Sequence, residues 1–154
     1  MIKSFKYKII IILLLMLTGC GYSPLFNSEK INFYINDLSF EGERQINNYI
    51  SRNLKKYQNF KKSQKKYDIK IISDYEKNIV NKDDSGNPKN YNIIVKANVR
   101  FVINDKDEVN KVFVRNTSLS ANTKKISEKE SELRNKKNLS NLISEDIIFF
   151  LMNQ

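Results

Sequence analysis

The chain of 154 residues contains no histidine, no tryptophan, one cysteine, four glycines and two prolines. Without histidine there is no imidazole to serve as a general base or a metal ligand, which excludes Ser–His and Cys–His nucleophile pairs. A single cysteine can form neither an intrachain disulfide nor a cysteine-rich zinc site. The glycines form neither G-x-G-x-x-G nor G-x-x-x-x-G-K-[ST], two motifs that cradle phosphates. We therefore expect a protein that is not an enzyme and that has no metal site and no cofactor.

The chain is strongly basic, with 27 Lys and Arg against 17 Asp and Glu and a net charge of +10. Lysine dominates this excess, although the planar guanidinium of arginine is better suited to bind phosphate groups. A plain solvated surface is therefore the first interpretation of any single lysine, and the basic run 61–66 is interpreted as an exposed loop. The sequence lacks the motifs and interleaved aromatic residues of nucleic-acid binders, so no nucleic-acid partner is expected.

The first eight residues carry three lysines and no acid, and residues 9–17 are uniformly apolar. A basic segment followed by an apolar segment and then by small residues is typical of a secretory signal peptide. A membrane-spanning helix is the alternative, but nine helical residues rise only about 14 Å, against about 30 Å of hydrocarbon in a bilayer. We interpret residues 1–19 as a signal peptide.

The apolar run ends at Leu17-Thr18-Gly19-Cys20, which resembles the lipobox at which bacterial lipoproteins are processed. The resemblance implies that the Cys20 thiol receives diacylglycerol, that the signal peptide is cut before Cys20, and that the new amine is acylated, with palmitate as a typical chain. Three acyl chains, at about 0.8 kcal/mol per buried methylene, anchor a protein effectively permanently. Gly21 stands where an aspartate would direct retention in the inner membrane, so we expect an outer-membrane protein on the periplasmic side. An ordinary cleavage site beside a chance cysteine is the alternative.

The pattern after the signal peptide predicts a lipidated tether over residues 20–30 and a single domain over residues 31–154. Alternation of apolar and polar residues predicts strands, and apolar residues three and four apart predict amphipathic helices. The predicted strands cover residues 31–36, 67 to about 80, 93–103 and 108–122, the predicted helices cover residues 43–57 and 127–152, and turn-forming residues fill positions 82–90.

The clearest of these patterns is the strand over residues 93–103, in which every second residue is apolar. Lys96, Asn98 and Arg100 occupy the opposite face of this strand. A register slip of one residue would expose the whole apolar set, so the pattern fixes which face is buried. The short connection at residues 105–107 predicts that the two strands it joins are antiparallel.

The last helix is predicted to begin at a capping box, with Ser127 as the N-cap residue and Glu130 at position N3. The two helices have apolar stripes, which consist of Ile46, Tyr49, Ile50, Leu54 and Tyr57 in the first and of Leu139, Leu142, Ile143, Ile147, Phe150 and Leu151 in the second. Two one-sided helices and a one-sided sheet bury their apolar surfaces together in two layers. We therefore predict an α+β fold of order β-α-β-β-β-α, with two helices on one face of a four-stranded, mainly antiparallel sheet.

The segment Cys20-Gly21-Tyr22-Ser23-Pro24-Leu25-Phe26 resembles the mature start, C-G-[FY]-x-[PL]-L-[YF] in outline, of the LPS-assembly lipoproteins of the LptE family. The chain length and the predicted element order are also similar. Members of that family pack two helices on a four-stranded sheet, sit as a plug inside the β-barrel LptD, help it to fold, and bind lipopolysaccharide (LPS). The resemblance implies a one-to-one partnership with an LptD-like barrel and a role in delivering LPS to the cell surface.

Basic residues are the natural candidates for contact with the phosphates of LPS. Each well-placed lysine or arginine near an anionic surface contributes about 1 kcal/mol. The strand face with Lys96, Asn98 and Arg100 is also a candidate for contact with the polar lumen of a barrel. The candidate contact residues for LPS or the barrel are Lys89, Lys96, Arg100, Lys111 and Arg115.

Two other classes of function are open at this point. An accessory lipid- or solute-binding lipoprotein of an envelope ABC-type transporter would share the anchor and the fold. A hydrolase would need carboxylates such as Asp74 and Glu76, although neighbouring acids on an exposed strand are usually solubility residues. Asp83 and Asp84 suggest a cation site only weakly, because the rest of a calcium-binding loop is missing.

Overall fold

The computed structural model describes residues 31–58 and 65–154. The predicted signal peptide, Cys20 and the tether lie outside these residues, as do residues 61–64 of the predicted basic loop. Those assignments therefore stay predictions. Lys65 and Lys66, which were included in that loop, begin a strand and are only half-exposed, so this part of the prediction is wrong. The fold described below is that of the compact unit Ile31–Gln154.

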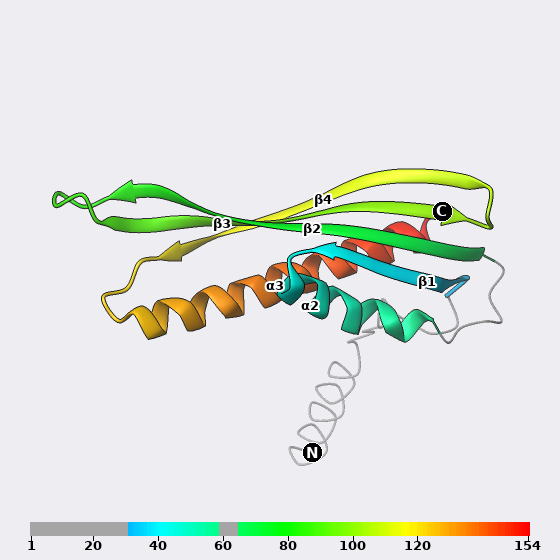
Figure 1. The fold of residues 1–154 in the computed structure, drawn as a ribbon, viewed down its shortest axis with the longest axis horizontal. Helices are drawn as coiled ribbons and strands as arrows, with labels where there is room; N and C mark the ends of the chain where they lie inside the picture. Colours follow the sequence, from blue (N-terminus) through cyan, green and yellow to red (C-terminus); the bar gives the residue numbers. More distant parts are fainter. Residues whose placement is uncertain (1–30, 59–64) are drawn as a thin grey trace, which may run out of the picture. The chain divides into compact units, whose positions relative to one another are not determined.

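The described domain is an α+β fold of the predicted order (Figure 1). Its elements are β1 (Phe33–Gly42), α2 (Arg44–Leu54) with the 3₁₀ turn η2 (Lys55–Tyr57), β2 (Lys65–Lys82), β3 (Pro88–Ile103), β4 (Asp107–Ser120) and α3 (Lys125–Met152). The order β-α-β-β-β-α predicted from the sequence is confirmed.

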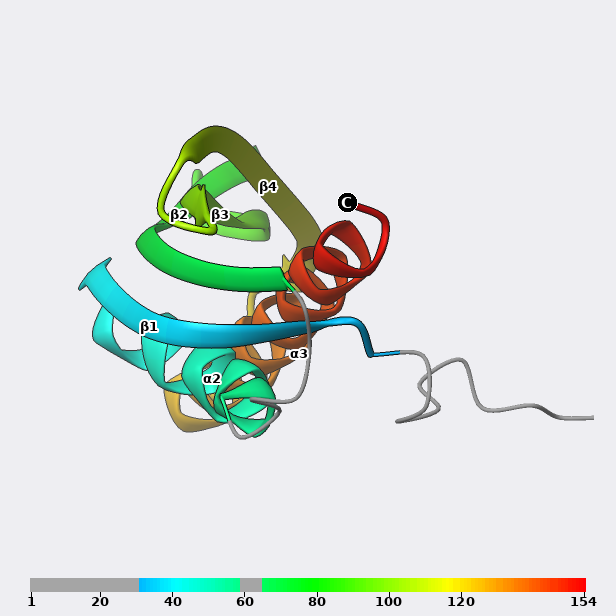
Figure 2. The ribbon, with the colours of Figure 1, turned by 90° about the vertical axis from the view of Figure 1, so that its right-hand side faces the viewer.

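The strands form one sheet in the order β1-β2-β3-β4. The β1–β2 pair is parallel, and the β2–β3 and β3–β4 pairs are antiparallel. The parallel pair needs a crossover connection, which α2 provides. Figure 2 shows α2 and α3 on the same side of the curved sheet. The mainly antiparallel sheet with both helices on one face is therefore confirmed.

The core lies between the sheet and the helices. The apolar face of β3 that was predicted over residues 93–103 is buried from Ile93 to Phe101. Side chains from every strand and both helices join it, including Phe33, Ile46, Ile50, Tyr67, Ile71, Phe113, Ile143 and Ile147, all 8% exposed or less. Phe101 and Phe150 pack with ring centroids 4.7 Å apart, which ties β3 to the end of α3.

Strand β1 is longer than the predicted strand over residues 31–36. Its register with β2 shifts between Ile35 and Asp37, so Asn36 is an extra residue in a β-bulge. The bulge reverses the alternation, and Leu38 and Phe40 pack against the core beyond it. The predicted strand ends at Asn36 because the apolar pattern changes phase at this bulge.

The connection between β3 and β4 is a tight turn, as predicted. Asn104 and Asp105 have φ values of +50° and +60°, and the N–H of Lys106 donates to the carbonyl of Ile103 at 3.0 Å. Positive φ at both central residues defines a type I′ turn, whose twist matches that of an antiparallel hairpin. The Asn104 Oδ1 also accepts a hydrogen bond from the N–H of Lys66 at 2.9 Å.

Helix α3 begins two residues earlier than predicted, and the predicted capping box is wrong. Ser127 lies inside the first turn, and no side chain caps the helix at its N-cap residue, Lys124. The N–H of Lys124 donates instead to Asn122 Oδ1 at 2.9 Å. The turn before the helix is thus organised by Asn122, which the match to the motif at Ser127 and Glu130 did not take into account.

Two members of the predicted helix stripes are not core residues. Leu142 is 43% exposed, and Tyr49 is only half-buried. Tyr57 packs as predicted, since its ring stacks on Phe33 at a centroid distance of 5.3 Å. Within residues 31–58 and 65–154, no helix is both long enough and apolar enough to span a bilayer.

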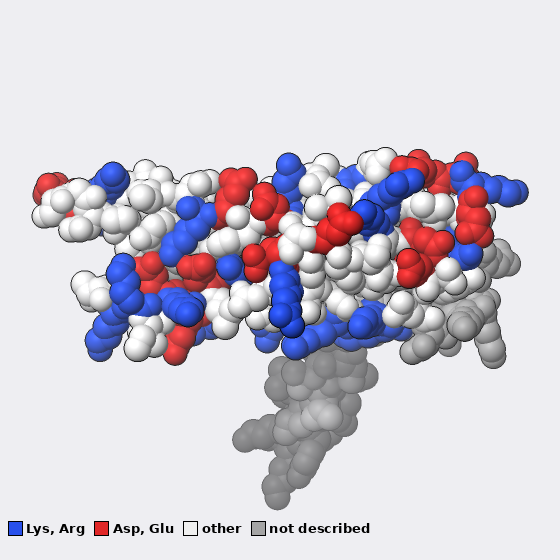
Figure 3. All heavy atoms as spheres, in the orientation of Figure 1, with Lys and Arg blue, Asp and Glu red and all other residues white. Residues whose placement is uncertain are grey.

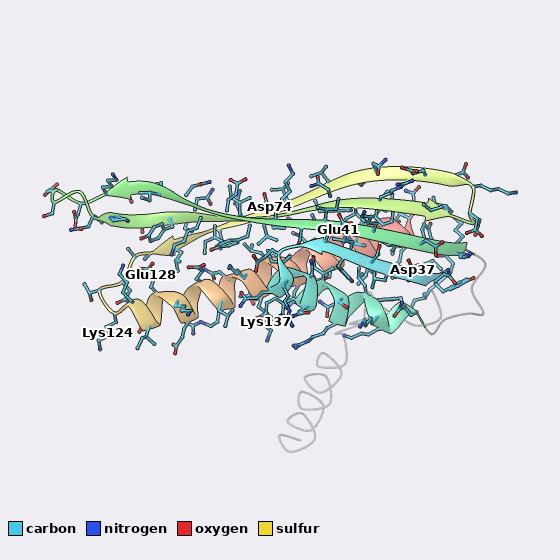
Figure 4. All side chains as sticks on the ribbon, viewed as in Figure 1. Asp37, Glu41, Asp74, Lys124, Glu128 and Lys137 are labelled. Atoms are coloured by element: carbon cyan, nitrogen blue, oxygen red, sulfur yellow. The ribbon has the colours of Figure 1, made fainter. Side chains whose placement is uncertain are left out.

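The β2–β3 hairpin extends beyond the end of β1, because β1 pairs with β2 only as far as Ser73. The first half of α3 runs beside this extension (Figure 1). Glu128, only 6% exposed, connects the two (Figure 4). Its carboxylate accepts hydrogen bonds from Lys77 Nζ at 2.9 Å and from the N–H of Asn122 at 3.1 Å. Lys77 also donates to Glu132 at 2.9 Å.

This cluster is held in its charged form. The hydrogen bonds from Lys77 and from the backbone of Asn122 lower the pKa of Glu128. Burial by itself would raise the pKa of Glu132, but hydrogen bonds from Lys77 and Tyr75 outweigh burial and lower that pKa as well. Burial would lower the pKa of Lys77, and its hydrogen bonds to the two carboxylates raise the pKa instead.

Candidate functional site on the open face of the sheet

The face of the sheet that points away from the helices, which we call the open face, is the candidate site. No helix of the described residues packs on it (Figures 1 and 2). In Figure 4, Asp74 lies on this side of the sheet. The side chains of the open face alternate with the core residues and comprise Lys70, Ile72, Asp74 and Glu76 of β2, Ile94, Lys96, Asn98 and Arg100 of β3, and Asn110, Val112, Val114 and Asn116 of β4.

Exposed aliphatic side chains run across the open face. Ile72 is 42% exposed, Val112 is 53% exposed and Val114 is 50% exposed. Asn98 pairs with Ile72 on one side and with Val112 on the other, so these three residues form one row across three strands. Val114, two residues further along β4, extends this apolar surface and pairs in register with Lys96. We call Ile72, Val112 and Val114 the apolar row. A sheet face in contact only with water would carry polar residues at these positions.

A shallow hollow of about 300 Å³ lies over this row. Its lining combines apolar and polar groups, namely Lys70, Ile72, Asn98, Val99, Arg100, Asn110, Lys111 and Val112. The hollow thus offers aliphatic contacts, amide groups and cationic side chains within one surface. Such a mixture suits a partner with both apolar and polar groups.

Ion pairs flank the apolar row. Lys70 Nζ lies 2.6 Å from Glu41 Oε1, and Arg100 Nη2 lies 2.5 Å from Glu108 Oε2. Hydrogen bonds from Asn110 and from Arg100 lower the pKa of Glu108. Lys96 makes no ion pair with any other described residue, although Asp74 lies opposite it in the strand register. A partner can therefore form an ion pair with Lys96 without breaking an ion pair among the described residues, whereas Lys70 and Arg100 already have acidic partners.

The structure divides the candidate residues predicted from the sequence. Lys96 and Arg100 lie on the open face, but Lys111 and Arg115 pair in register with the core residues Val99 and Val95 and lie on the helix side of β4. Strand β4 is at the edge of the sheet, beside α3. The side chains of Lys111 and Arg115 therefore extend towards α3 and not into the solvent over the open face.

Both of these side chains have partners on α3. The Arg115 guanidinium donates two hydrogen bonds to Asp146, at 2.7 Å from Nε and 2.5 Å from Nη2. These hydrogen bonds raise the pKa of Arg115. Lys111 Nζ lies 4.4 Å from the ring centroid of Phe150, a cation–π distance. Because Lys111 and Arg115 already contact α3, we infer that they hold the edge strand β4 against this helix. Their predicted contact with LPS or a barrel stays a prediction.

Lys89 lies in a third place, near the tip of the β2–β3 hairpin. It lines a hollow of about 510 Å³ together with Asp83, Asn87, Pro88, Ala121, Asn122, Thr123 and Lys125. The five candidate residues therefore do not form a single site.

The acidic pairs considered in the sequence analysis are exposed surface residues. Asp74 accepts a hydrogen bond from the N–H of Tyr75 at 2.8 Å, and Glu76 accepts one from Asn78 at 3.1 Å. Asp83 accepts hydrogen bonds from the N–H groups of Ser85 and Asn87, which shapes the hairpin turn. In the part of the chain that the structure describes, no three Cys, Asp or Glu side chains are grouped to hold a metal ion.

The apolar row was missed by the sequence analysis, which assigned each strand one apolar face. The signal is present in the sequence, because Ile71-Ile72 and Val112-Phe113-Val114 are consecutive apolar residues within strands. Consecutive apolar residues in a strand point to opposite faces. Such runs predict apolar side chains on the open face as well as in the core.

No protein-family model and no curated protein matches this chain. Solved structures do resemble it. The rare lipoprotein B from Shewanella oneidensis aligns with a TM-score of 0.52 and 12% identity, over 77% of this chain and 98% of that one. The uncharacterized lipoprotein B from Nitrosomonas europaea aligns with a TM-score of 0.57 and 14% identity, over 83% of this chain and 88% of that one. At these identities the likeness establishes a shared fold.

Proposed function

We propose that the protein is an outer-membrane lipoprotein that assists the assembly of an LPS-translocating β-barrel, plugs it, and helps to deliver LPS to the cell surface. The observation that carries the proposal is the open face, whose apolar row is covered by no helix of residues 31–58 and 65–154. Two further features support it, namely the lipobox ending at Cys20 and the fold shared with two proteins described as lipoproteins.

Three aliphatic side chains that are 42–53% exposed on one sheet face favour contact with another surface. The flanking pairs Lys70–Glu41 and Arg100–Glu108 keep that face polar enough for water when no partner is bound. The lumen of a large barrel is polar and is commonly filled by a plug. The mixed character of the open face fits such a lumen better than it fits lipid.

LPS is the second partner in the proposal. Its lipid A phosphates would meet the basic residues of the open face, with Lys96 as the first candidate because it has no ion pair among the described residues. The protein would act by binding alone, without a catalytic group.

The anchor is tested first, by metabolic labelling of the protein with palmitate in cells. We expect the wild-type protein to be labelled and to stay with the outer membrane, and Cys20→Ala to lose the label and to migrate as the unprocessed precursor. Three acyl chains make the anchor effectively permanent, so the difference between the two should be nearly complete. A wild-type protein that takes up no label would contradict the proposed anchor.

The barrel partner is tested by purification of the tagged wild-type protein from outer membranes and by depletion of the protein from cells. We expect a β-barrel to co-purify in a one-to-one ratio, and the barrel to misassemble and surface LPS to fall after depletion. Normal barrel assembly without the protein would rule out the assembly role. Co-purification with an inner-membrane transporter instead would support the ABC-type alternative.

A further inference from the structure

The outer surface of the helix layer has an unusual charge distribution. Helix α2 and η2 carry Arg44, Arg52, Lys55 and Lys56 and no acidic residue, and all four of these side chains are exposed. The buried residues of α2 are Ile46, Ile50 and Leu54. At 100° per residue, the four cations lie on the opposite side of the helix from these three. We call Arg44, Arg52, Lys55 and Lys56 the basic face.

None of the four cations of the basic face makes an ion pair with another described residue. Lys137 of α3 is another exposed cation of the helix layer (Figure 4). Figure 3 shows Lys and Arg side chains gathered along the lower edge of the domain, where α2 lies. Helix α3 carries the exposed acids Glu130 and Glu145, and Glu43 is half-buried ahead of α2. Helix α2 and η2 themselves contain no acid. The cations in this region therefore outnumber the acids.

Apolar side chains accompany the basic face. Phe149 is 69% exposed and Leu142 is 43% exposed, and they are seven positions apart, which corresponds to nearly two turns of α3. Both point away from the sheet, because the core side of α3 carries Leu139, Ile143 and Ile147. An exposed phenylalanine leaves a large apolar area in contact with water, which is unfavourable unless another surface covers it.

The chain enters the domain close to this surface. Phe33 at the start of β1 stacks on Tyr57 of η2 and is paired in register with Lys65. The Nζ of Lys65 in turn donates to the backbone carbonyl of Gln154, after the end of α3. Residue 31 is thus near the ends of both helices. Ten residues lie between Cys20 and Ile31, so the distance from Cys20 to Ile31 is at most about 40 Å when the chain is extended.

We propose that the outer surface of the helix layer docks on an anionic lipid surface, with the basic face on the headgroups and Phe149 and Leu142 at the boundary with the acyl chains. Helices that lie in a membrane interface combine basic residues with exposed aromatic and aliphatic side chains in this way. The helix layer and the open face are on opposite sides of the sheet, so docking leaves the open face accessible to a barrel. The proposal goes beyond the proposed function, since it concerns the domain before it joins any partner.

The test measures the binding of the mature chain, residues 20–154, to lipid vesicles. Cys20→Ser is included in every variant, so that acyl chains cannot account for binding. We expect co-sedimentation with vesicles of phosphatidylcholine mixed with phosphatidylglycerol, little with phosphatidylcholine alone, and weaker binding as salt rises, because salt screens exposed charges.

Two matched variants locate the binding surface. The combination Arg44→Gln, Arg52→Gln, Lys55→Gln and Lys56→Gln should lower the partition coefficient on the order of 1,000-fold, given the contribution of each of the four cations near an anionic surface. The control removes the same charge from exposed lysines of the loops and the open face, with Lys82→Gln, Lys89→Gln, Lys96→Gln and Lys106→Gln. We expect the partition coefficient of the control to fall by less than about fivefold, because the control only reduces the net charge of the protein.

A second readout reports orientation. The chain has no native tryptophan, so Phe149→Trp and Val112→Trp each give a protein with a single tryptophan. Brominated lipids should quench the tryptophan at position 149 and not the one at position 112. Equal losses in the two quadruple variants, equal binding to neutral vesicles, no binding at all, or quenching at position 112 alone would each overturn the docking proposal. None of these outcomes bears on whether a barrel co-purifies, which tests the proposed function separately.

Discussion

Replacing Gly42 with alanine is expected to destabilise the domain by at least about 4 kcal/mol or to prevent folding. Gly42 ends β1 with a φ of +91°, which L side chains rarely adopt. A Cβ atom there would lie 1.9 Å from the backbone oxygen of Ser73 and 3.0 Å from its carbonyl carbon. The chain cannot easily move away, because the N–H of Glu43 donates to that same oxygen at 3.1 Å.

Gly86→Ala is the matched control for this substitution. Gly86 also has a positive φ, +82°, but a Cβ atom added there meets nothing within 4 Å. Its replacement should therefore cost only the backbone strain, about 1–2 kcal/mol. Urea denaturation of both variants gives the comparison. Equal losses of unfolding free energy would show that the close approach at Ser73 has little effect.

Lys77→Met is expected to lower the free energy of unfolding by about 3 kcal/mol, because it leaves the buried carboxylate of Glu128 without its main cation. The side chains of Lys77 and Glu128 are 24% and 7% exposed, so water replaces the lost contact poorly. Lys77 also lies over the ring of Tyr91 at 4.1 Å, and this contact is lost in the variant as well.

The double variant Lys77→Met and Glu128→Gln separates packing from charge. Glutamine keeps an acceptor for the N–H of Asn122 but removes the unpaired charge, so the double variant should recover about 1–2 kcal/mol relative to Lys77→Met. If the double variant is no more stable than Lys77→Met, the lost free energy of unfolding comes from packing alone.

The same cluster predicts how stability depends on pH. The pKa values of Glu128 and Glu132 are lowered in the folded protein from their ordinary value of 4.5. Their contribution to stability is therefore fully present above that value and is lost as the pH falls through the lowered folded values. Lys77→Met should show a weaker loss of stability over this acidic range, as measured by urea denaturation at each pH.

Much of the fold could be predicted from the sequence because its core residues follow simple periods. The strand over residues 93–103 alternates without interruption, and its apolar face is the buried one. The pattern gave poorer predictions where a local feature interrupts the period, as the bulge at Asn36 does in β1. The capping motif at Ser127 failed for a related reason, since a longer-range contact from Glu128 to Lys77 and Asn122 sets the start of α3.

The candidate site was less accessible to sequence reasoning, because residue type does not say which face of a strand is covered. Lys111 and Arg115 have the same character as Lys96 and Arg100, yet they lie on the helix side and contact Phe150 and Asp146. Only the register between β3 and β4 separates the two sets. The short turn between the two strands fixes that register, but β4 has apolar residues on both faces, so its residue types alone do not show which face is covered.

The most direct test of the proposed function is photocrosslinking in living cells from the open face. A photoreactive amino acid is placed at Val112 in the apolar row and, as a control, at the exposed Asn48 on the outer side of α2. We predict that position 112 captures an outer-membrane β-barrel and that position 48 does not. Capture of the barrel only from position 48, or of a transporter subunit from position 112, would contradict the assignment of the open face as the surface that meets the barrel.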